Sequence, residues 1–596
     1  MLARMFPIIG WARTYRSDDL RPDLVAGVTV AAMLVPQAMA YALLAGLPPQ
    51  IGLYAATVPV LVYAVLGTSR QLAVGPVAIV SLLTATALAP FAEEGTAEYL
   101  AAAAMLALIV GAVHLVVGIA RLGKLVSLLS HAVLVGFTSA AAVIIGFSQV
   151  RHILGVRIAR QEHFYETVRE VLGSFGGIHW LTFAIGTLSL VVLRTLKSKA
   201  PRVPGALIVV VGSILAAEAF DLSPRGVSVV GEIPDQLPFF SLPTGQGSLA
   251  LDLLPSALLI TLVGFMESIA VARVYARRHG YSLEPNQELI GLGAANLAAG
   301  VFGSYPVTGG FSRTAVNDSA GARTPLASII TAVLVLFTLA FLTPLLASLP
   351  NAALGAIIIS AVLGLIDVKE IRHIAKVKKS DLVSLIIAFA ATLILGIELG
   401  IAVAVVASIL VVFARMSTPH KAVLGQIEGT STYRNVDRFP EATTQVGTTI
   451  LRIDAAISFI NATHIKGYLL EQANELSNES NPTLILNASG INDIDATGAE
   501  MIREVLDDLN ELGVAMHLSE VKGPARDVLQ RSGLWNTFEH RIHASTNEAV
   551  RVVQGQSAAS TSLRQAGIDE GPSSEEQESK WLHPRSNPLQ LPQSAS

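Results

Sequence analysis

Residues 303–317 read Gly-Ser-Tyr-Pro-Val-Thr-Gly-Gly-Phe-Ser-Arg-Thr-Ala-Val-Asn and lie between two strongly apolar segments. Pro306, Gly309 and Gly310 prevent one continuous helix through this stretch. Arg313 places a permanent charge where the flanking sequence predicts membrane depth, at a cost of roughly 2.5 to 3.5 kcal/mol on insertion scales. Such a charge is kept only where it faces a protein interior or a wet cavity, and broken backbone needs the same shelter.

A short helix that begins at Phe311 or Ser312 would concentrate positive potential at one point. Its first N–H groups have no partner within the helix, and the Ser312 hydroxyl and the Arg313 guanidinium lie beside them. The stretch therefore predicts an anion-binding site. Two plainer interpretations stay open: Arg313 forms only a tertiary ion pair, and Ser312 serves only as the helix N-cap.

The composition indicates a membrane protein. The chain has 596 residues and is 52% hydrophobic and 14% charged, and its mean hydropathy is +0.56, which is too apolar for a soluble protein of this length. The net charge of -4 gives no indication of nucleic-acid binding, and the absence of Cys excludes disulfides and thiolate metal sites. Because no metal-ligand spacing and no set of nucleophile, base and orienting group is evident, we predict neither a metal, nor a cofactor, nor an enzyme.

The apolar segments fall into two similar halves of seven. In each half the third segment is short and interrupted by Gly and Pro, and the first of these would reach only roughly 21 Å as a helix, whereas about 20 residues are needed to cross a membrane. Matching broken segments predict two half-helices and a transporter site between inverted repeats. The predicted segments are residues 23–45, 51–66, 76–89, 99–120, 129–150, 181–193, 204–220, 251–274, 288–302, 303–317, 326–346, 353–366, 382–397 and 399–413.

The distribution of Lys and Arg predicts the orientation. Basic residues lie mainly in the loops on the side of the two termini, with one discordant cluster at Arg151–Arg169, so we expect a cell-membrane protein with cytoplasmic termini. The expected domains are a cytoplasmic lead (1–22), a transmembrane domain (23–416), a polar linker (417–447), a small cytoplasmic α/β domain (448–555) in which strands alternate with helices, and a disordered tail (556–596) rich in Ser, Gln, Glu and Pro.

The first half supplies further candidate ligands of an anion. Gly75, Val77 and Ala78 begin the short segment and offer free N–H groups, and a proline at a helix start loses no needed donor. Gln37 and Tyr41 lie one turn apart on one helix face and could donate from an amide and a hydroxyl. The alternatives are a packing kink at Gly75, an interhelical hydrogen bond for Gln37 and ordinary packing for Tyr41.

Several motifs resemble the sulfate permease family, also called solute carrier family 26. They are Asp23-Leu-Val-Ala-Gly, Val35-Pro-Gln-Ala-Met-Ala-Tyr, Val74-Gly-Pro, Phe265-Met-Glu-Ser-Ile-Ala and Gly310-Phe-Ser-Arg-Thr-Ala-Val-Asn, and Asp493-Ile-Asp-Ala-Thr-Gly resembles the STAS domain (sulfate transporter and anti-sigma factor antagonist). The resemblance covers nearly everything except the tail. It implies seven plus seven inverted segments in a core and a gate domain, a homodimer, and elevator-like alternating access.

The resemblance also implies roles for single residues. Gln37 stands at the substrate site, where some members carry a carboxylate. Glu267, about 16 residues into an apolar run, matches the carboxylate of proton-coupled members near the arginine. Our hypothesis is that Glu267 pairs with Arg313 in the empty site and takes a proton as the anion binds; the alternative is a fixed ion pair. Thr497 occupies the position that related antagonists phosphorylate, with simple N-capping as the alternative.

These observations predict a secondary active transporter that takes up sulfate with protons. The same fold leaves open sodium-coupled bicarbonate uptake or uptake of a dicarboxylate such as fumarate. A different class also stays open, an anion sensor that moves nothing and signals to a protein partner through the STAS domain.

Overall fold

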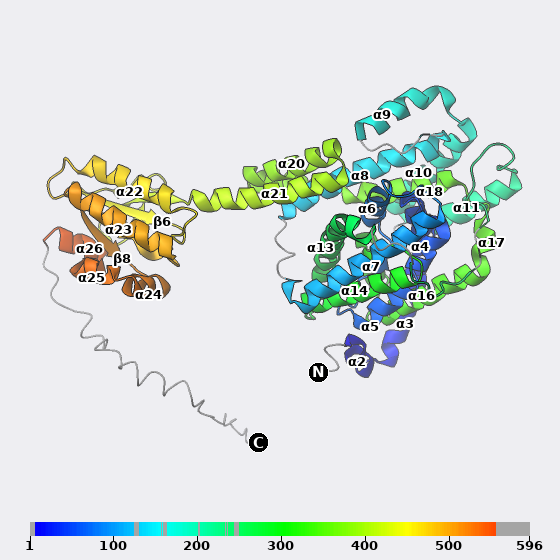
Figure 1. Ribbon diagram of the computed structural model, residues 1–596, viewed down its shortest axis with the longest axis horizontal. Coiled ribbons are helices and arrows are strands. Elements are labelled where there is room, and N and C mark those ends of the chain that lie inside the picture. The colour runs from blue at the N-terminus through cyan, green and yellow to red at the C-terminus, as the bar shows by residue number, and fades with distance from the viewer. Residues whose placement is uncertain are drawn as a thin grey trace, which may run out of the picture. The chain divides into compact units, whose positions relative to one another are not determined.

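The computed structural model of the protein describes residues 6–123, 130–156, 158, 164–200, 203–232, 234, 236–243 and 249–555. The chain divides into two compact units, Met1–Val411 and Val412–Ser596. The first is helical and the second combines helices with a sheet (Figure 1). The tail predicted at 556–596 lies outside the described residues.

The first half of the helical unit follows the predicted order of segments. Its third segment, α6, has 11 residues, about half the length needed to span the hydrocarbon core. The amphipathic α9 was not predicted from the sequence. The helices are α2 (Pro7–Arg13), α3 (Ser17–Leu44), α4 (Pro49–Ala55), α5 (Val58–Leu66), α6 (Ala78–Leu88), α7 (Ala97–Ile119), α8 (His131–Leu154), α9 (Phe164–Gly173), α10 (Trp180–Lys199) and α11 (Gly205–Ala219).

The second half repeats this order, and its third segment is the nine-residue α15. With α4 and α5 counted as one segment, and α16 and α17 as another, the prediction of seven plus seven segments with two half-helices is confirmed. The amphipathic α19 was missed. The helices are α12 (Leu249–Asp252), α13 (Leu254–Arg278), α14 (Pro285–Val301), α15 (Phe311–Ser319), α16 (Leu326–Phe337), α17 (Thr343–Leu346), α18 (Asn351–Val362), α19 (Val368–Val377), α20 (Lys379–Leu395) and α21 (Ile397–Ser417).

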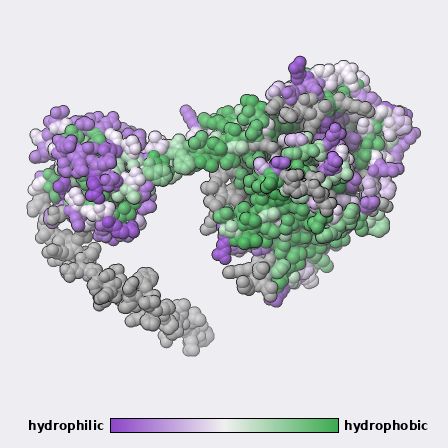
Figure 2. Space-filling model, viewed as in Figure 1, coloured by the Kyte–Doolittle hydropathy of each residue, from purple (hydrophilic) through white to green (hydrophobic). Residues whose placement is uncertain are grey.

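The surface of the helical unit suits a lipid environment. Among the described residues, nine helices or joined helix pairs are long and apolar enough to cross a membrane. Large apolar side chains such as Ile119, Phe341 and Leu410 are exposed, and Figure 2 shows hydrophobic residues over much of the visible face of this unit, whereas the second unit is mainly hydrophilic. An apolar surface of this extent marks contact with lipid.

The helices pack in two groups. In one, α14 packs along α7 and α5, and α3 packs along α16; in the other, α8 packs along α20 and α18, and α18 along α10. These groups are the core and gate domains. Both half-helices contact the core group, since α15 and α6 both contact α3 and α13.

The second unit is built on one sheet of order β4-β3-β6-β7-β8-β9, with β5 also paired to β3. Strands β6 to β9 are parallel, as βα crossovers require. The strands are β3 (Lys421–Ile427), β4 (Tyr433–Asn435), β5 (Ala442–Thr443), β6 (Thr448–Ile453), β7 (Thr483–Asn487), β8 (Ala515–Ser519) and β9 (Ile542–His543), and the helices are α22 (Ala462–Leu476), α23 (Ala496–Glu511), α24 (Gly523–Arg531), α25 (Leu534–Phe538) and α26 (Thr546–Val553).

The prediction that residues 417–447 form a linker is wrong. This stretch contains β3, β4 and β5, and β3 pairs antiparallel with β6 from Lys421↔Ile453 to Leu424↔Ile450. Ala422 and Leu424 are buried against Ile450. The polar composition of the stretch concealed the strands, because a strand with one buried face needs only every second residue to be apolar.

Candidate functional site

Two short strands join the starts of the half-helices. β1 (Val74–Gly75) precedes α6, and β2 (Thr308–Gly309) precedes α15. They pair antiparallel, Val74 with Gly309 and Gly75 with Thr308, and the Gly310 N–H donates to the carbonyl of Ala73 over 3.1 Å. The sequence predicted both breaks but not this pairing, which brings the two broken segments together.

The N-termini of α6 and α15 therefore lie close together. Val77 and Gly310 are the two N-cap residues, and neither helix has a side-chain cap. A Cβ atom on Gly310 would lie only 3.3 Å from Cγ1 of Val77. The first free N–H groups of both helices, which include that of Ala78, add positive potential to one small region.

Arg313, on α15, lies in the same region. Its side chain is 2% exposed, and its Nη1 donates to the carbonyl oxygen of Pro76. Nε and Nη2 are buried and have no hydrogen-bond partner among the described residues. A Cβ atom would lie 3.0 Å from Nη2 at Gly310 and 3.5 Å from it at Gly75, so the two glycines leave room around the guanidinium.

Tyr41 and Glu267 lie near Arg313 in an apolar interior, and Gln37 lies one helical turn before Tyr41 on α3. The side chains of Gln37, Tyr41 and Glu267 are all buried, and Tyr41 and Glu267 are near enough to Arg313 to interact with it electrostatically. Gln37 Oε1 and Glu267 Oε2 have no hydrogen-bond partner within the described part of the chain. Buried polar atoms without partners are rare in folded proteins and need an explanation.

The ion pair predicted between Glu267 and Arg313 is not formed. Among the described residues, no guanidinium nitrogen of Arg313 lies within 4.0 Å of a carboxylate oxygen of Glu267. Arg313 is instead anchored by the Pro76 carbonyl, which the end of β1 presents to its Nη1. The two charges interact through space, and each keeps atoms available for another partner.

Two other predicted site residues, Phe311 and Ser312, have exposed side chains. Phe311 is 45% exposed, and the Ser312 side chain is exposed as well. The interpretation of Ser312 as the N-cap is wrong, because Gly310 holds that position. Phe311 and Ser312 are the first two residues of α15, so their backbone N–H groups have no acceptor within the helix.

Sequence reasoning missed the residues that hold the β1–β2 pair in place. The Ser268 hydroxyl on α13 bonds to both Thr308 Oγ1 (2.6 Å) and the Gly309 N–H (2.8 Å). Asn296 on α14 bonds to both backbone groups of Val307. Their signal in the sequence was a polar residue within an apolar segment, which at membrane depth calls for a partner.

In the second unit, Thr497 is exposed near the start of α23. The interpretation of Thr497 as N-cap is wrong, since Asp495 caps the helix and accepts from the Gly498 N–H over 2.8 Å. Asp495 also accepts from the Phe459 N–H. The Thr497 side chain is therefore accessible, and its phosphorylation stays a prediction.

Comparison with known proteins agrees with this architecture. A family model described as "Sulfate permease family" matches residues 20–388, and one described as "STAS domain" matches residues 439–549. The chain is 40% identical over 574 residues to sulfate transporter 4.1, chloroplastic, of Arabidopsis thaliana, with 92% of this chain and 83% of that protein covered. It is 37% identical over 531 residues to a probable sulfate transporter of Mycobacterium tuberculosis, with 88% and 94% covered.

Solved structures show the same fold. The murine solute carrier 26 family member A9 anion transporter, in the inward-facing state, superposes with a TM-score of 0.84 at 25% identity, covering 92% of this chain and 94% of that one. The transmembrane domain of the cyanobacterial bicarbonate transporter BicA gives a TM-score of 0.57 at 22% identity, covering 66% and 98%. Paired half-helices in a core domain, a C-terminal α/β unit and matches over most of the chain lead to one conclusion: the protein belongs to the sulfate permease family of membrane anion transporters and carries a STAS domain.

Proposed function

We propose that the protein is a secondary active transporter that takes up sulfate together with protons by elevator-like alternating access. The observation that carries the proposal is the buried Arg313, whose Nε and Nη2 have no partner among the described residues and lie beside two helix N-termini. An isolated buried charge is costly unless something pairs with it. An anion supplies that pairing.

Sulfate fits the chemistry of these donors. An arginine fork grips two oxygens of an oxyanion, and backbone N–H groups at helix N-termini bind others. Gln37 and Tyr41 add side-chain donors from α3. Relatives that cover most of this chain are named as sulfate transporters, which favours sulfate over bicarbonate and dicarboxylates.

Glu267 is proposed as the proton carrier. Its carboxylate and a bound anion would compete for the same positive potential of Arg313, so binding is easier once Glu267 is neutral. No direct ion pair is needed for this linkage, because the competition acts through space. A proton then travels with each anion, and a pH gradient drives accumulation.

A coupled sodium ion is less well supported. The nearest suitable oxygens in the β2 region are the hydroxyls of Thr308 and Ser268, and each already has hydrogen-bond partners. Thr308 Oγ1 donates to the Gly264 carbonyl over 2.6 Å, and Ser268 Oγ accepts from the Gly309 N–H. After these bonds each hydroxyl keeps only one acceptor lone pair, so the two together offer few ligands to a cation.

Elevator-like movement is favoured over sensing because the candidate ligands all lie on the core side. α3 and α13 each contact both α6 and α15, and Ser268 and Asn296 tie the β1–β2 pair to α13 and α14. Such a site would move as one body past the gate helices. The proposal extends to a homodimer in the cell membrane with cytoplasmic termini, and to a STAS domain that binds a protein partner or is phosphorylated at Thr497.

The test is uptake of labelled sulfate into liposomes that contain the purified protein, with an inward pH gradient. We expect accumulation that requires the gradient, that unlabelled sulfate suppresses, and that is independent of sodium. Bicarbonate, fumarate and chloride serve as competitors. If the protein instead accumulates bicarbonate and needs a sodium gradient, both the proposed substrate and the proposed coupling ion are wrong. If it binds sulfate without any flux, it is a sensor rather than a transporter.

A further inference from the structure

A cavity of about 720 Å³ lies away from Arg313, where several membrane helices begin or end. Its wall includes Arg21 in the second turn of α3, His279 directly after α13, Asp318 near the end of α15 and Thr324 just before α16. Helices that span a membrane end near its water boundary. The cavity therefore lies at the membrane surface, on the side of the N-terminus.

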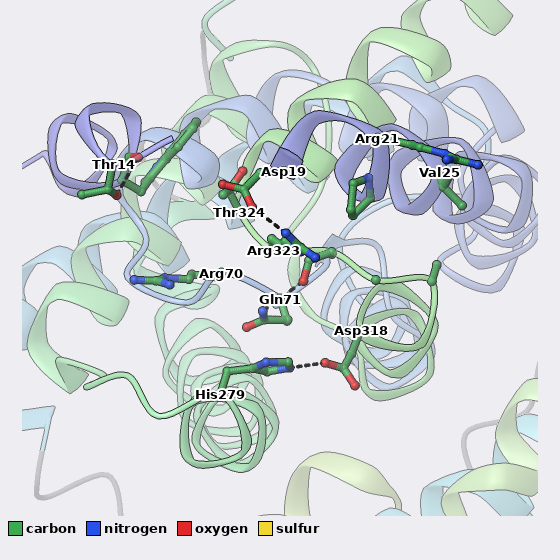
Figure 3. A pocket seen from close by; sticks show the side chains of 15 residues that line it. Thr14, Asp19, Arg21, Val25, Arg70, Gln71, His279, Asp318, Arg323 and Thr324 are labelled. Carbon is green, nitrogen blue, oxygen red and sulfur yellow. Dashed lines mark hydrogen bonds and ion pairs between the residues drawn. The ribbon is translucent and has the colours of Figure 1, made fainter. Parts of the chain in front are cut away.

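The acidic side chains of the cavity are already paired. Asp318 accepts from Arg278 over 2.7 Å and also bonds to His279, and Asp19 accepts from Arg323 over 3.1 Å. Figure 3 shows the pairs of His279 with Asp318 and of Asp19 with Arg323 across the cavity. The carboxylates thus leave little negative potential to repel an anion.

Arg21 and Arg70 remain as positive charges without an ion pair among the described residues. They lie at opposite sides of the cavity, with Gln71 between them (Figure 3). The Arg70 guanidinium lies over the ring of Tyr281, 4.9 Å from its centre. The Tyr281 hydroxyl accepts from the Arg70 N–H and donates to Gln71 Oε1, so this arginine is held in place before any ligand arrives.

Trp11 of α2 supplies a second, independent observation. It lines the same cavity, and its Nε1 is shielded from solvent and has no acceptor within the described ranges. Trp11 and Arg70 also line a neighbouring cavity of about 670 Å³, into which Arg121 contributes a further guanidinium. An indole N–H without an acceptor, beside guanidinium groups without an ion pair, suits a ligand rich in oxygen acceptors.

We propose that this cavity binds a phosphate-bearing anion at the membrane surface, the headgroup of an anionic phospholipid, with Arg70 and the Trp11 indole N–H as its main ligands. Guanidinium groups bind phosphate oxygens in a bidentate manner, and tryptophan is enriched at the level of lipid headgroups. Free phosphate shares this chemistry and is the second source to distinguish. The cavity adjoins the end of α15, so a ligand bound in it would contact the helix that carries Arg313.

The experiment is native mass spectrometry of the full-length protein with dioctanoyl phosphatidic acid, dioctanoyl phosphatidylcholine or inorganic phosphate. We expect tighter binding of phosphatidic acid than of phosphatidylcholine. Arg70→Gln and Trp11→Phe should each weaken phosphatidic acid binding by about tenfold, consistent with loss of a charge-assisted hydrogen bond or an indole donor. Arg225→Gln, at an exposed arginine outside the cavity, is the matched control and should bind as the wild type does.

The phosphate arm identifies the source. If inorganic phosphate displaces the lipid, and its own binding depends on Arg70 and Trp11, the ligand is a free anion. If phosphate has no effect on lipid binding, the ligand is the lipid headgroup. Equal binding of the two lipids, or unchanged binding by both cavity variants, overturns the proposal. Because the readout is binding rather than flux, this result is independent of whether the protein moves sulfate.

Discussion

Two buried carboxylates on consecutive helices have opposite surroundings. Glu288, on α14, is 1% exposed and accepts four hydrogen bonds, from the Tyr63 hydroxyl, from the N–H and hydroxyl of Thr68, and from the Ser69 N–H. Glu267, on α13, is 6% exposed, and its Oε2 has no partner among the described residues. A carboxylate with four donors is part of the fold's hydrogen-bond network, whereas one with few partners can change its bonding at small cost to the fold.

The same contrast separates other buried charges. Asp23, at the start of the Asp23-Leu-Val-Ala-Gly motif, accepts from both backbone and side chain of Thr324 and from the Arg323 N–H. It resembles Glu288 and holds the loop before α16. Arg313 resembles Glu267, because its Nε and Nη2 lack partners in the described structure. Fully bonded charges thus mark the scaffold, and incompletely bonded ones mark the proposed site.

The largest effect is expected at the incompletely bonded arginine. Arg313→Gln should lower sulfate uptake at least about 100-fold, because charge-assisted hydrogen bonds contribute about 1.5 to 3 kcal/mol each and two nitrogens are lost. Initial rates in liposomes measure this, and melting curves should show that the variant folds. Arg225→Gln is the control, and an Arg313 variant that keeps more than about a tenth of the rate would contradict the role.

Glu267→Gln should separate coupling from binding. The amide cannot carry a proton, so accumulation driven by a pH gradient should vanish, while sulfate exchange stays within about threefold of the wild type. Because Glu267 has few partners to lose, the melting temperature should not fall. Gradient-driven accumulation in this variant would show that the proton is carried elsewhere.

Glu288→Gln should show the opposite pattern. Its amide nitrogen is a donor placed against the donors of Thr68 and Tyr63, so the free energy of unfolding should fall by about 2 to 3 kcal/mol. Thermal melting in detergent, side by side with Glu267→Gln, measures the difference. Equal melting temperatures for the two variants would remove the distinction between scaffold and site.

A smaller effect is expected in the STAS domain, where His517 Nδ1 and His543 Nε2 are 2.9 Å apart. Burial lowers the pKa of His517 to about 4 and also lowers the pKa of His543, whereas an unfolded histidine titrates near about 6.5. The unfolded state therefore binds more protons below that pH. Stability of this domain should be constant above about pH 6.5 and should fall as the pH drops toward 4.

Hydrogen exchange of the full-length protein measures that dependence domain by domain. In His517→Gln the decrease in protection of β8 and β9 between pH 7.5 and pH 5 should be smaller than in the wild type. The same decrease in both proteins would show that this pair does not set the acid sensitivity of the domain.

The sequence predicted the helices well because membrane depth imposes long apolar runs, and because Pro306 and the paired glycines around Arg313 can only break them. It also predicted a polar site at Arg313, since a charge at that depth needs a reason; the structure places Tyr41 and Glu267 near this arginine, and their roles stay predictions. It did not predict the β1–β2 pair, because strands of two residues have no period to detect. The amphipathic α9 and α19 were missed for a related reason, as their polar faces obscured the apolar signal.

The local bonding of single side chains could not be predicted either. The anchoring of Arg313 by the Pro76 carbonyl depends on where β1 ends. The N-caps Gly310 and Asp495 each lie two residues before the residue that the sequence suggested, Ser312 and Thr497. Likewise, within 417–447 β3 pairs with β6, and β4 and β5 pair with β3; these are tertiary contacts that propensity does not encode.

The most direct test of the account is a structure of the protein with bound selenate, a heavier analogue of sulfate that can be located by its anomalous scattering. The account predicts one tetrahedral anion within hydrogen-bond distance of Arg313 Nη2 and of the first N–H groups of α6 and α15, with no such anion in Arg313→Gln. Selenate bound only elsewhere, or bound equally in the variant, would contradict the claim that the paired half-helices and Arg313 form the substrate site.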